Sequence, residues 1–200
     1  MKKYIKSFAI IIILVFANIG FAQDTYTLKD TKDVDIKLLG TSTLHDWEMN
    51  ASNATGAAQF IVNEVDATKL KSLKTLTFNL LVKDLQSDSK ALDKNAYKAL
   101  KTDDFKDINY VLSSSTLIPD NEGYLLKSKG KLTIAGVTKD INMDILITVN
   151  DDNTISCKGV YILKMTDYNV EPPSFMMGLM TTGDDATLDF DVTYALNDNQ

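Results

Sequence analysis

Alternation of apolar and polar residues, with a period of two, dominates the chain after residue 33. The clearest alternating runs are Val34 to Gly40, Leu76 to Val82, Leu126 to Ile134, Ile141 to Val149, Ile155 to Met165 and Leu188 to Tyr194. Lysine, aspartate, asparagine or threonine occupies many of the intervening positions. Because successive side chains of a β-strand point to opposite faces, each run predicts a strand with one buried and one exposed face.

Three weaker segments, at residues 26–28, 47–62 and 108–117, raise the expected number of strands to eight or nine. Short turn sequences separate the strands, such as Pro119 to Gly123 and Ala135-Gly136. Consecutive strands joined by short turns are antiparallel. Because each strand has one apolar face, the sheet must close on itself or pack against a second sheet.

One segment, between Ser87 and Lys101, has helical periodicity instead. Its regularly spaced apolar residues are Leu92, Ala96, Tyr97 and Leu100. The preceding Ser87-Asp88-Ser89 can cap the first turn of a helix. We expect this short helix to cover or plug one end of the β-structure. No linker or low-complexity tract follows residue 22, so the rest of the chain is expected to form one domain.

The first 22 residues have the pattern of a secretory signal peptide. Lysines at positions 2, 3 and 6 precede the apolar run Phe8 to Phe16, and Gly20-Phe21-Ala22 resembles a cleavage site. The run is shorter than the roughly 20 apolar residues that a spanning helix needs, and no cysteine follows it to carry a lipid. We therefore expect residues 23–200 to form a periplasmic or secreted domain without a stable membrane anchor.

The charge of the chain limits its partners. The 200 residues, 44% of them hydrophobic, include 27 acidic residues and 21 basic residues, all lysine. Removing a leader that carries three lysines and no acidic residue leaves 18 lysines against 27 acidic residues, a net charge of -9. Nucleic acids and anionic membranes attract the opposite charge, and arginine, the usual bidentate ligand of phosphate, is absent from the sequence. We expect no nucleic-acid partner.

Few residues could support catalysis or metal binding. The chain has one histidine, His45, and one cysteine, Cys157, which excludes zinc sites built from several such ligands. No Gly-x-Ser-x-Gly motif identifies a nucleophile for His45. Asp151-Asp152-Asn153 and Gly183-Asp184-Asp185 lack the calcium-loop pattern and are interpreted as turns between strands. We therefore expect no catalytic residue, no metal and no cofactor, with Cys157 as a free thiol in the core.

The segment from Tyr168 to Gly183 departs from the strand pattern. It contains two of the three prolines, followed by Phe175, Met176, Met177, Leu179 and Met180. A connection of this length without regular structure is usually functional or disordered, and methionine clusters suit adaptable contact with apolar ligands. Two interpretations stay open: these residues close one end of the core, or they contact a ligand.

Four segments of the sequence resemble the YceI-like family. They are Gly40 to Trp47 (GTSTLHDW), Leu92 to Leu100 (LDKNAYKAL) with Phe105 and Ile108, Gly130 to Lys139 (GKLTIAGVTK), and Met165 to Tyr168 (MTDY) with Gly183-Asp184. They occur in the family's order and span almost the whole chain after the leader. The third segment, between two alternating strands, is the most specific.

Members of that family are exported bacterial lipocalin-like proteins that bind polyisoprenoid lipids. The resemblance implies an all-β fold: an eight-stranded antiparallel lipocalin-like barrel with one short helix at an end and a long apolar ligand along its axis. Barrels of this size are either filled by side chains or hold one small ligand. We expect the small inward residues Gly40, Ser128, Gly130 and Gly159 to leave space for it.

Candidate ligand contacts are the inward residues of the strands and the apolar residues near the barrel ends. The expected wall residues are Phe78, Leu80, Tyr110, Leu132, Ile145, Tyr161, Leu163 and Phe190. Those expected nearer an end are Trp47, Phe175, Met176 and Met180. For His45, two interpretations stay open: it satisfies backbone groups at the start of a strand, or it contacts a polar head group.

The favoured function is that of an exported protein, not an enzyme, which holds a polyisoprenoid, an isoprenoid quinone or a similar long-chain lipid for transport, storage or sequestration. The alternative is a ligand-free periplasmic structural or stress-response protein whose barrel is fully packed. An enzyme that uses His45 is the third hypothesis. The head group and chain length of the ligand stay open, as does the oligomeric state, a homodimer included.

Overall fold

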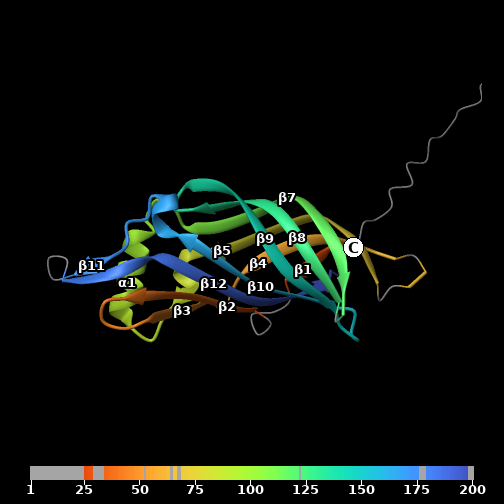
Figure 1. Cartoon of the computed structure of the whole chain (residues 1–200), viewed down its shortest axis with the longest axis horizontal. Coiled ribbons are helices and arrows are strands. Elements are labelled where there is room, and N and C mark those ends of the chain that lie inside the picture. Colours follow the sequence, from red (N-terminus) through yellow and green to blue (C-terminus); the bar gives the residue numbers. More distant parts are fainter. Residues whose placement is uncertain are drawn as a thin grey trace, which may run out of the picture.

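The computed structural model describes residues 25–28, 34–51, 53–63, 65–66, 69–121, 123–175 and 179–197 (Figure 1). The strands are β1 (Tyr26–Leu28), β2 (Val34–Ser42), β3 (Trp47–Ala51), β4 (Thr55–Val62), β5 (Leu70–Leu81), β6 (Leu85–Gln86), β7 (Asp107–Asp120), β8 (Gly123–Ile134), β9 (Val137–Val149), β10 (Ile155–Lys164), β11 (Ser174–Phe175) and β12 (Met180–Leu196). The helices are η2 (Val82–Asp84), α1 (Lys90–Ala99) and η3 (Met165–Tyr168). The predicted leader lies outside the described residues and stays a prediction.

The strands form a closed antiparallel barrel of eight strands, which confirms the predicted fold. Three of the eight barrel strands each consist of two successive segments: β1 with β2, β3 with β4, and β5 with β6. Each strand pairs with its neighbours in sequence, and the ring closes between the first strand and the last. Tyr26 of β1 lies opposite Leu196 of β12, and Val34 of β2 lies opposite Val192. The segment predicted as a strand over residues 47–62 is thus divided between β3 and β4.

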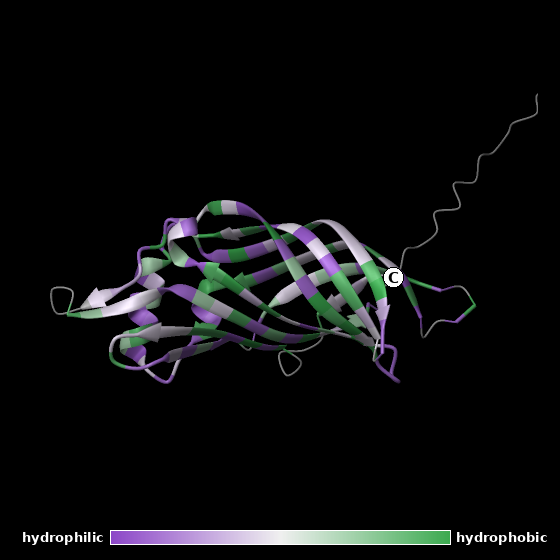
Figure 2. Ribbon diagram, viewed as in Figure 1, coloured by the Kyte–Doolittle hydropathy of each residue, from purple (hydrophilic) through white to green (hydrophobic). Residues whose placement is uncertain are grey.

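Burial along the strands follows the predicted alternation. Leu126 and Leu132 of β8 are buried, whereas the lysines between them are exposed. Figure 2 shows this alternation as bands of high and low hydropathy along the ribbons. The outer face is not uniformly polar, because Leu146 on β9 and both Val160 and Ile162 on β10 are exposed.

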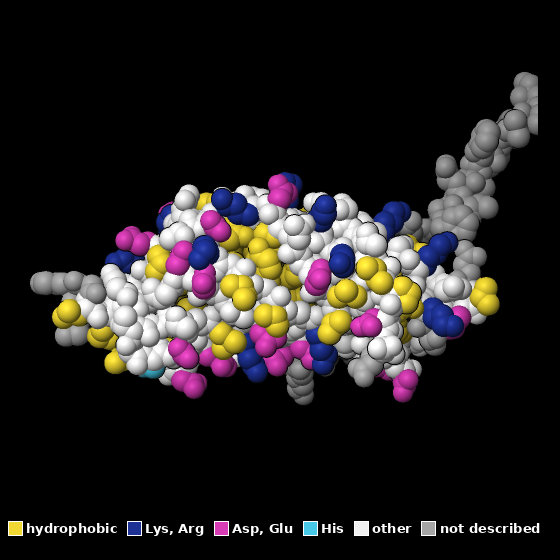
Figure 3. Space-filling model, viewed as in Figure 1, with side chains coloured by type: hydrophobic (Ala, Val, Ile, Leu, Met, Phe, Trp, Pro, Cys, Tyr) yellow, Lys and Arg dark blue, Asp and Glu magenta, His cyan; other side chains and the backbone are white. Residues whose placement is uncertain are grey.

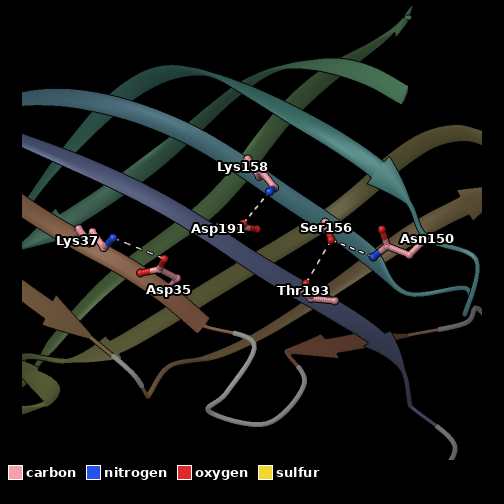
Figure 4. A network of polar contacts seen from close by, with 7 residues as sticks. All are labelled: Asp35, Lys37, Asn150, Ser156, Lys158, Asp191 and Thr193. Carbon is pink, nitrogen blue, oxygen red and sulfur yellow. Dashed lines mark hydrogen bonds and ion pairs between the residues drawn. The ribbon is translucent and has the colours of Figure 1, made fainter. Parts of the chain in front are cut away.

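Lysine and aspartate pair across neighbouring strands on the outside of the barrel. Lys158 of β10 lies 2.8 Å from its register partner Asp191 of β12, and Lys131 of β8 lies 2.8 Å from its register partner Asp140 of β9. Figure 4 shows the first of these pairs beside a chain of hydrogen bonds that joins Asn150, Ser156 and Thr193. Figure 3 shows charged side chains of both signs spread over the visible face. Because these pairs are exposed, each contributes little to stability.

Helix α1 lies at one end of the barrel, as the sequence predicted (Figure 1). The Ser89 hydroxyl accepts a hydrogen bond from the Leu92 backbone amide and caps the first turn. The Tyr97 hydroxyl donates to the backbone carbonyl oxygens of Lys83 and Leu85, at 3.1 and 2.9 Å. The helix is therefore held to the barrel edge next to β6 by hydrogen bonds.

Aromatic packing fills the opposite end of the barrel. The ring of Phe60 meets the edge of Tyr26 at a centroid distance of 5.4 Å and that of Tyr194 at 6.1 Å. Ala58 and Leu126 are completely or almost completely buried in the same core. Edge-to-face pairs of this kind stabilise a core beyond the area that they bury. This end is consequently a packed core.

The expectation that small inward residues leave space for a ligand is wrong for three glycines. Aromatic rings from neighbouring strands lie directly over them. The pairs are Gly40 with Trp47, Gly130 with Tyr110 and Gly159 with Phe190. A Cβ atom placed on any of the three would lie within 2.6 Å of an atom of that ring. Each glycine therefore allows a large ring to pack closely against the backbone of the barrel wall.

Ser128, the fourth small residue, is also enclosed. Its hydroxyl donates a hydrogen bond to the Met143 carbonyl oxygen at 2.8 Å and lies 3.2 Å from the Tyr110 hydroxyl, which donates to it. Burial raises the pKa of Tyr110, so this hydroxyl stays protonated at neutral pH. The hydrogen-bonded chain holds the Tyr110 ring over Gly130.

The interpretation of Gly183-Asp184-Asp185 as a turn is also wrong, because these residues lie within β12. The pairing of β12 with β2 shifts register between Thr182 and Ala186, as in a β-bulge. At this point the Asp184 carboxylate accepts hydrogen bonds from the backbone amide and hydroxyl of Thr166, at 2.9 and 2.7 Å. These bonds lower the pKa of Asp184 and tie η3 to the barrel wall.

We predict that Gly159→Ala destabilises the protein by about 1–3 kcal/mol, because the new methyl group must displace the Phe190 ring. Urea denaturation of the variant and the wild type measures this difference. The double variant Gly159→Ala/Phe190→Leu should lose less free energy of unfolding than the sum of the losses in the two single variants. Stability within about 0.5 kcal/mol of wild type would show that the ring is not held against the glycine.

Candidate ligand-binding site

A cavity of about 200 Å³ occupies the half of the barrel nearer α1. Its wall includes inward residues of nearly every barrel strand, such as Met49 of β3, Leu76 of β5 and Ile141 of β9. Val192 and Tyr194 of β12 mark its inner limit, since Phe60 and Leu126 of the packed half do not line it. The interior is therefore divided into a filled half and a hollow half.

Helix α1 and the segment after β10 cover the cavity. The helix and the residue that follows it contribute one face to the lining, namely Leu92, Asn95, Ala96, Ala99 and Leu100. None of the helix residues is fully buried. On the other side, Tyr168 of η3, Val170 and Pro173 complete the lining, and the Lys101 ammonium group donates a hydrogen bond to the Asn169 carbonyl oxygen at 3.2 Å. This bond links the helix end to the η3 segment.

Nine of the twelve predicted contact residues line this cavity. They are Trp47, Phe78, Leu80, Tyr110, Leu132, Ile145, Tyr161, Leu163 and Phe190. Met180 begins β12 and is not part of the lining. Met176 and the side chain of Phe175 lie outside the described residues. The structure thus brings the predicted wall residues together, while their contact with a ligand stays a prediction.

Sequence reasoning missed the contribution of α1 and of the segment after β10. The spacing of Leu92, Ala96 and Leu100 predicts a helix that covers or plugs one end, but it does not single out these residues as ligand contacts. Tyr168, Pro173 and Thr182, from the region with two open interpretations, also line the cavity. Part of that segment therefore both closes the end of the barrel and borders the space inside it.

The cavity is apolar. Among the described lining residues there is no lysine, aspartate, glutamate or histidine, and the polar ones are Asn95, Thr182, Cys157 and the tyrosines. An isolated charge in such a space would be strongly destabilised, whereas a hydrocarbon chain would lose contact with water at no electrostatic cost. The site is therefore suited to an uncharged apolar molecule.

His45 lies away from the cavity. It is exposed in the turn between β2 and β3, where its Nδ1 atom is 2.7 Å from the Asp46 carbonyl oxygen. The Ser42 hydroxyl donates to the His45 carbonyl oxygen and accepts from the His45 amide. These contacts favour the interpretation in which His45 satisfies backbone groups beside a strand.

Metal-binding clusters and membrane-spanning helices are both absent from the described residues. No group of three or more metal-binding side chains comes together in that part of the chain. None of its helices has both the length and the apolar character needed to cross a membrane.

The fold and the cavity define a class of small antiparallel barrels that enclose an apolar space. A family model described as the YceI-like domain matches residues 29–194. The chain therefore belongs to the YceI-like family. No curated protein sequence matches the chain.

Several solved structures share the fold. BcnA of Burkholderia cenocepacia superimposes with a TM-score of 0.64 at 15% identity, covering 82% of this chain and 98% of that one. A polyisoprenoid-binding domain of Saccharophagus degradans, implicated in plant cell wall breakdown, gives 0.63 at 10% identity, covering 86% and 98%. The YceI protein of Campylobacter jejuni gives 0.52 at 19% identity, covering 72% and 82%. At these identities the likeness shows the fold.

The inward position of Cys157 gives a prediction about its reactivity. Burial is the main cause that raises the pKa of this thiol from 9.0 to about 12, so the thiol is protonated at pH 8. We expect it to react with a disulfide reagent such as DTNB at least about a hundredfold more slowly in the native protein than in guanidinium chloride. Comparable rates in the two states would contradict its placement in the barrel wall.

Proposed function

We propose that this protein is an exported carrier that holds a long-chain apolar lipid, such as a polyisoprenoid or an isoprenoid quinone, inside its barrel. The observation that carries the proposal is the apolar cavity beneath α1. Side chains fill only one half of the interior, and the other half is lined almost entirely by hydrocarbon and aromatic groups. A bound lipid would supply the packing that this half lacks.

Burial of apolar surface provides the driving force for binding. Each Å² removed from water contributes roughly 25 cal/mol, so even a few isoprene units in the cavity would give measurable affinity. The lining offers no charged group that would need to be desolvated first. Binding and release, without a chemical step, are what such a site supports, since His45 lies outside it.

Two further observations support the proposal. The Saccharophagus degradans domain with the same fold is described as polyisoprenoid-binding. The first 22 residues have the pattern of a signal peptide, which favours a periplasmic or secreted location. The carrier would there move or store a lipid that is too apolar to cross the aqueous space alone.

Native mass spectrometry of the protein purified from its own cell envelope tests this function. We expect an additional mass from a noncovalent apolar ligand in the wild-type protein. Ala96→Phe should remove it or lower the occupancy at least about tenfold, because Ala96 lines the cavity and the added ring would occupy it.

The matched control is Ala91→Phe, which adds the same ring to the exposed face of α1. This variant should retain the ligand at the wild-type level. Repeated absence of an apolar ligand from the wild-type protein, together with failure to take up isoprenoid lipids added in detergent, would contradict the proposed function.

A further inference from the structure

Two tyrosine side chains line the cavity near its covered end. Tyr161 lies on β10, and Tyr168 ends the η3 helix that follows this strand. Tyr168 is only 2% exposed, yet its hydroxyl forms no hydrogen bond with the described residues, and neither does that of Tyr161. Among the described residues, every fully enclosed polar side-chain atom has a hydrogen-bond partner. The Tyr168 hydroxyl is therefore not enclosed by protein and borders open space.

The other two tyrosines of the lining, Tyr110 and Tyr194, are placed differently. The Tyr110 hydroxyl already donates to Ser128. The Tyr194 hydroxyl lies at the inner limit of the cavity against Gly56 of β4, where a Cβ atom would come within 2.8 Å of it. Tyr161 and Tyr168 are thus the two lining tyrosines whose donors are available at the covered end.

The two hydroxyls remain donors over the physiological pH range. Burial is the main cause that raises the pKa of Tyr168 to about 12, and the nearby Tyr161 hydroxyl raises it further. Burial also raises the pKa of Tyr161. A neutral hydroxyl pair can donate to a carbonyl oxygen, but it does not neutralise a phosphate, and no cationic side chain is present in the described lining.

We propose that Tyr161 and Tyr168 form the head-group site of the barrel, and that this site selects lipids whose polar end is uncharged and accepts hydrogen bonds. The inference rests on the proposed lipid-binding function and specifies its ligand class. The acceptor would lie between the tyrosines beneath η3, with the hydrocarbon chain extending toward Val192 and Tyr194 of β12. An isoprenoid ketone meets this description, and an isoprenoid phosphate does not.

Three probes with similar isoprenoid chains and different ends separate these possibilities: geranylgeranylacetone, geranylgeranyl monophosphate and the hydrocarbon phytane. Their affinities are measured by displacement of the fluorescent probe N-phenyl-1-naphthylamine from the delipidated full-length mature protein. We expect the wild type to bind the ketone at least about tenfold more tightly than the phosphate. One well-made hydrogen bond corresponds to about a three- to tenfold change in affinity.

Tyr161→Phe and Tyr168→Phe should each weaken ketone binding about three- to tenfold, and the double variant more, with phytane affinity unchanged. Because neither hydroxyl bonds to any of the described residues, both variants should retain wild-type stability in urea. The matched control, Tyr124→Phe, removes a hydroxyl outside the cavity lining, one that accepts a hydrogen bond from the Leu70 backbone amide, and should leave ketone affinity within about twofold.

The outcomes distinguish the two proposals. Unchanged ketone affinity in the double variant would overturn the head-group site and leave lipid binding intact. Phosphate binding as tight as ketone binding in the wild type would do the same. Failure of the wild type to bind any of the three probes would instead contradict the lipid-binding function itself.

Discussion

Pairing of the last strand with the first is the interaction on which the rest of this structure depends. Strand β12 pairs with β10 along one edge and with β1 and β2 along the other, so its 17 residues close the sheet into a ring. Closure gives every strand an inside and an outside, even though β10 is paired with β9 only from Ile155 to Lys158. The alternating residues then acquire their roles: apolar side chains gather inside, and lysines pair with aspartates outside.

Aromatic rings decide how the enclosed space is divided. An eight-stranded barrel is just wide enough for side chains to fill it, so the size of the inward residues determines whether any space remains. Tyr26, Phe60 and Tyr194 pack edge to face and fill one end. Elsewhere, rings such as Phe190 pack closely against glycines such as Gly159. The cavity begins where this aromatic core ends, at Val192 and Tyr194.

Much of the barrel could be predicted because alternation is a local signal. The strands around Leu126, Ile145 and Cys157 are read directly from a period of two. The pairs of glycine and aromatic ring could not be predicted, because they depend on which residues the register places side by side. The bulge at Asp184 could not be predicted either, because Gly183-Asp184-Asp185 has the composition of a turn although it lies inside a long strand. For the segment that begins at Tyr168 the sequence leaves two interpretations open, because the position of Tyr168 depends on how η3 folds at the barrel end.

Helix α1 has a consequence for how the protein responds to its surroundings. No residue of the helix is fully buried, and its apolar face borders the cavity, while hydrogen bonds through Tyr97 and Lys101 hold its C-terminal end. A molecule in the cavity would therefore act as the missing core beneath the helix, and its binding energy would add directly to the free energy of unfolding. The loaded and empty proteins would share one fold but differ in lifetime, so the supply of ligand would set how long each molecule persists.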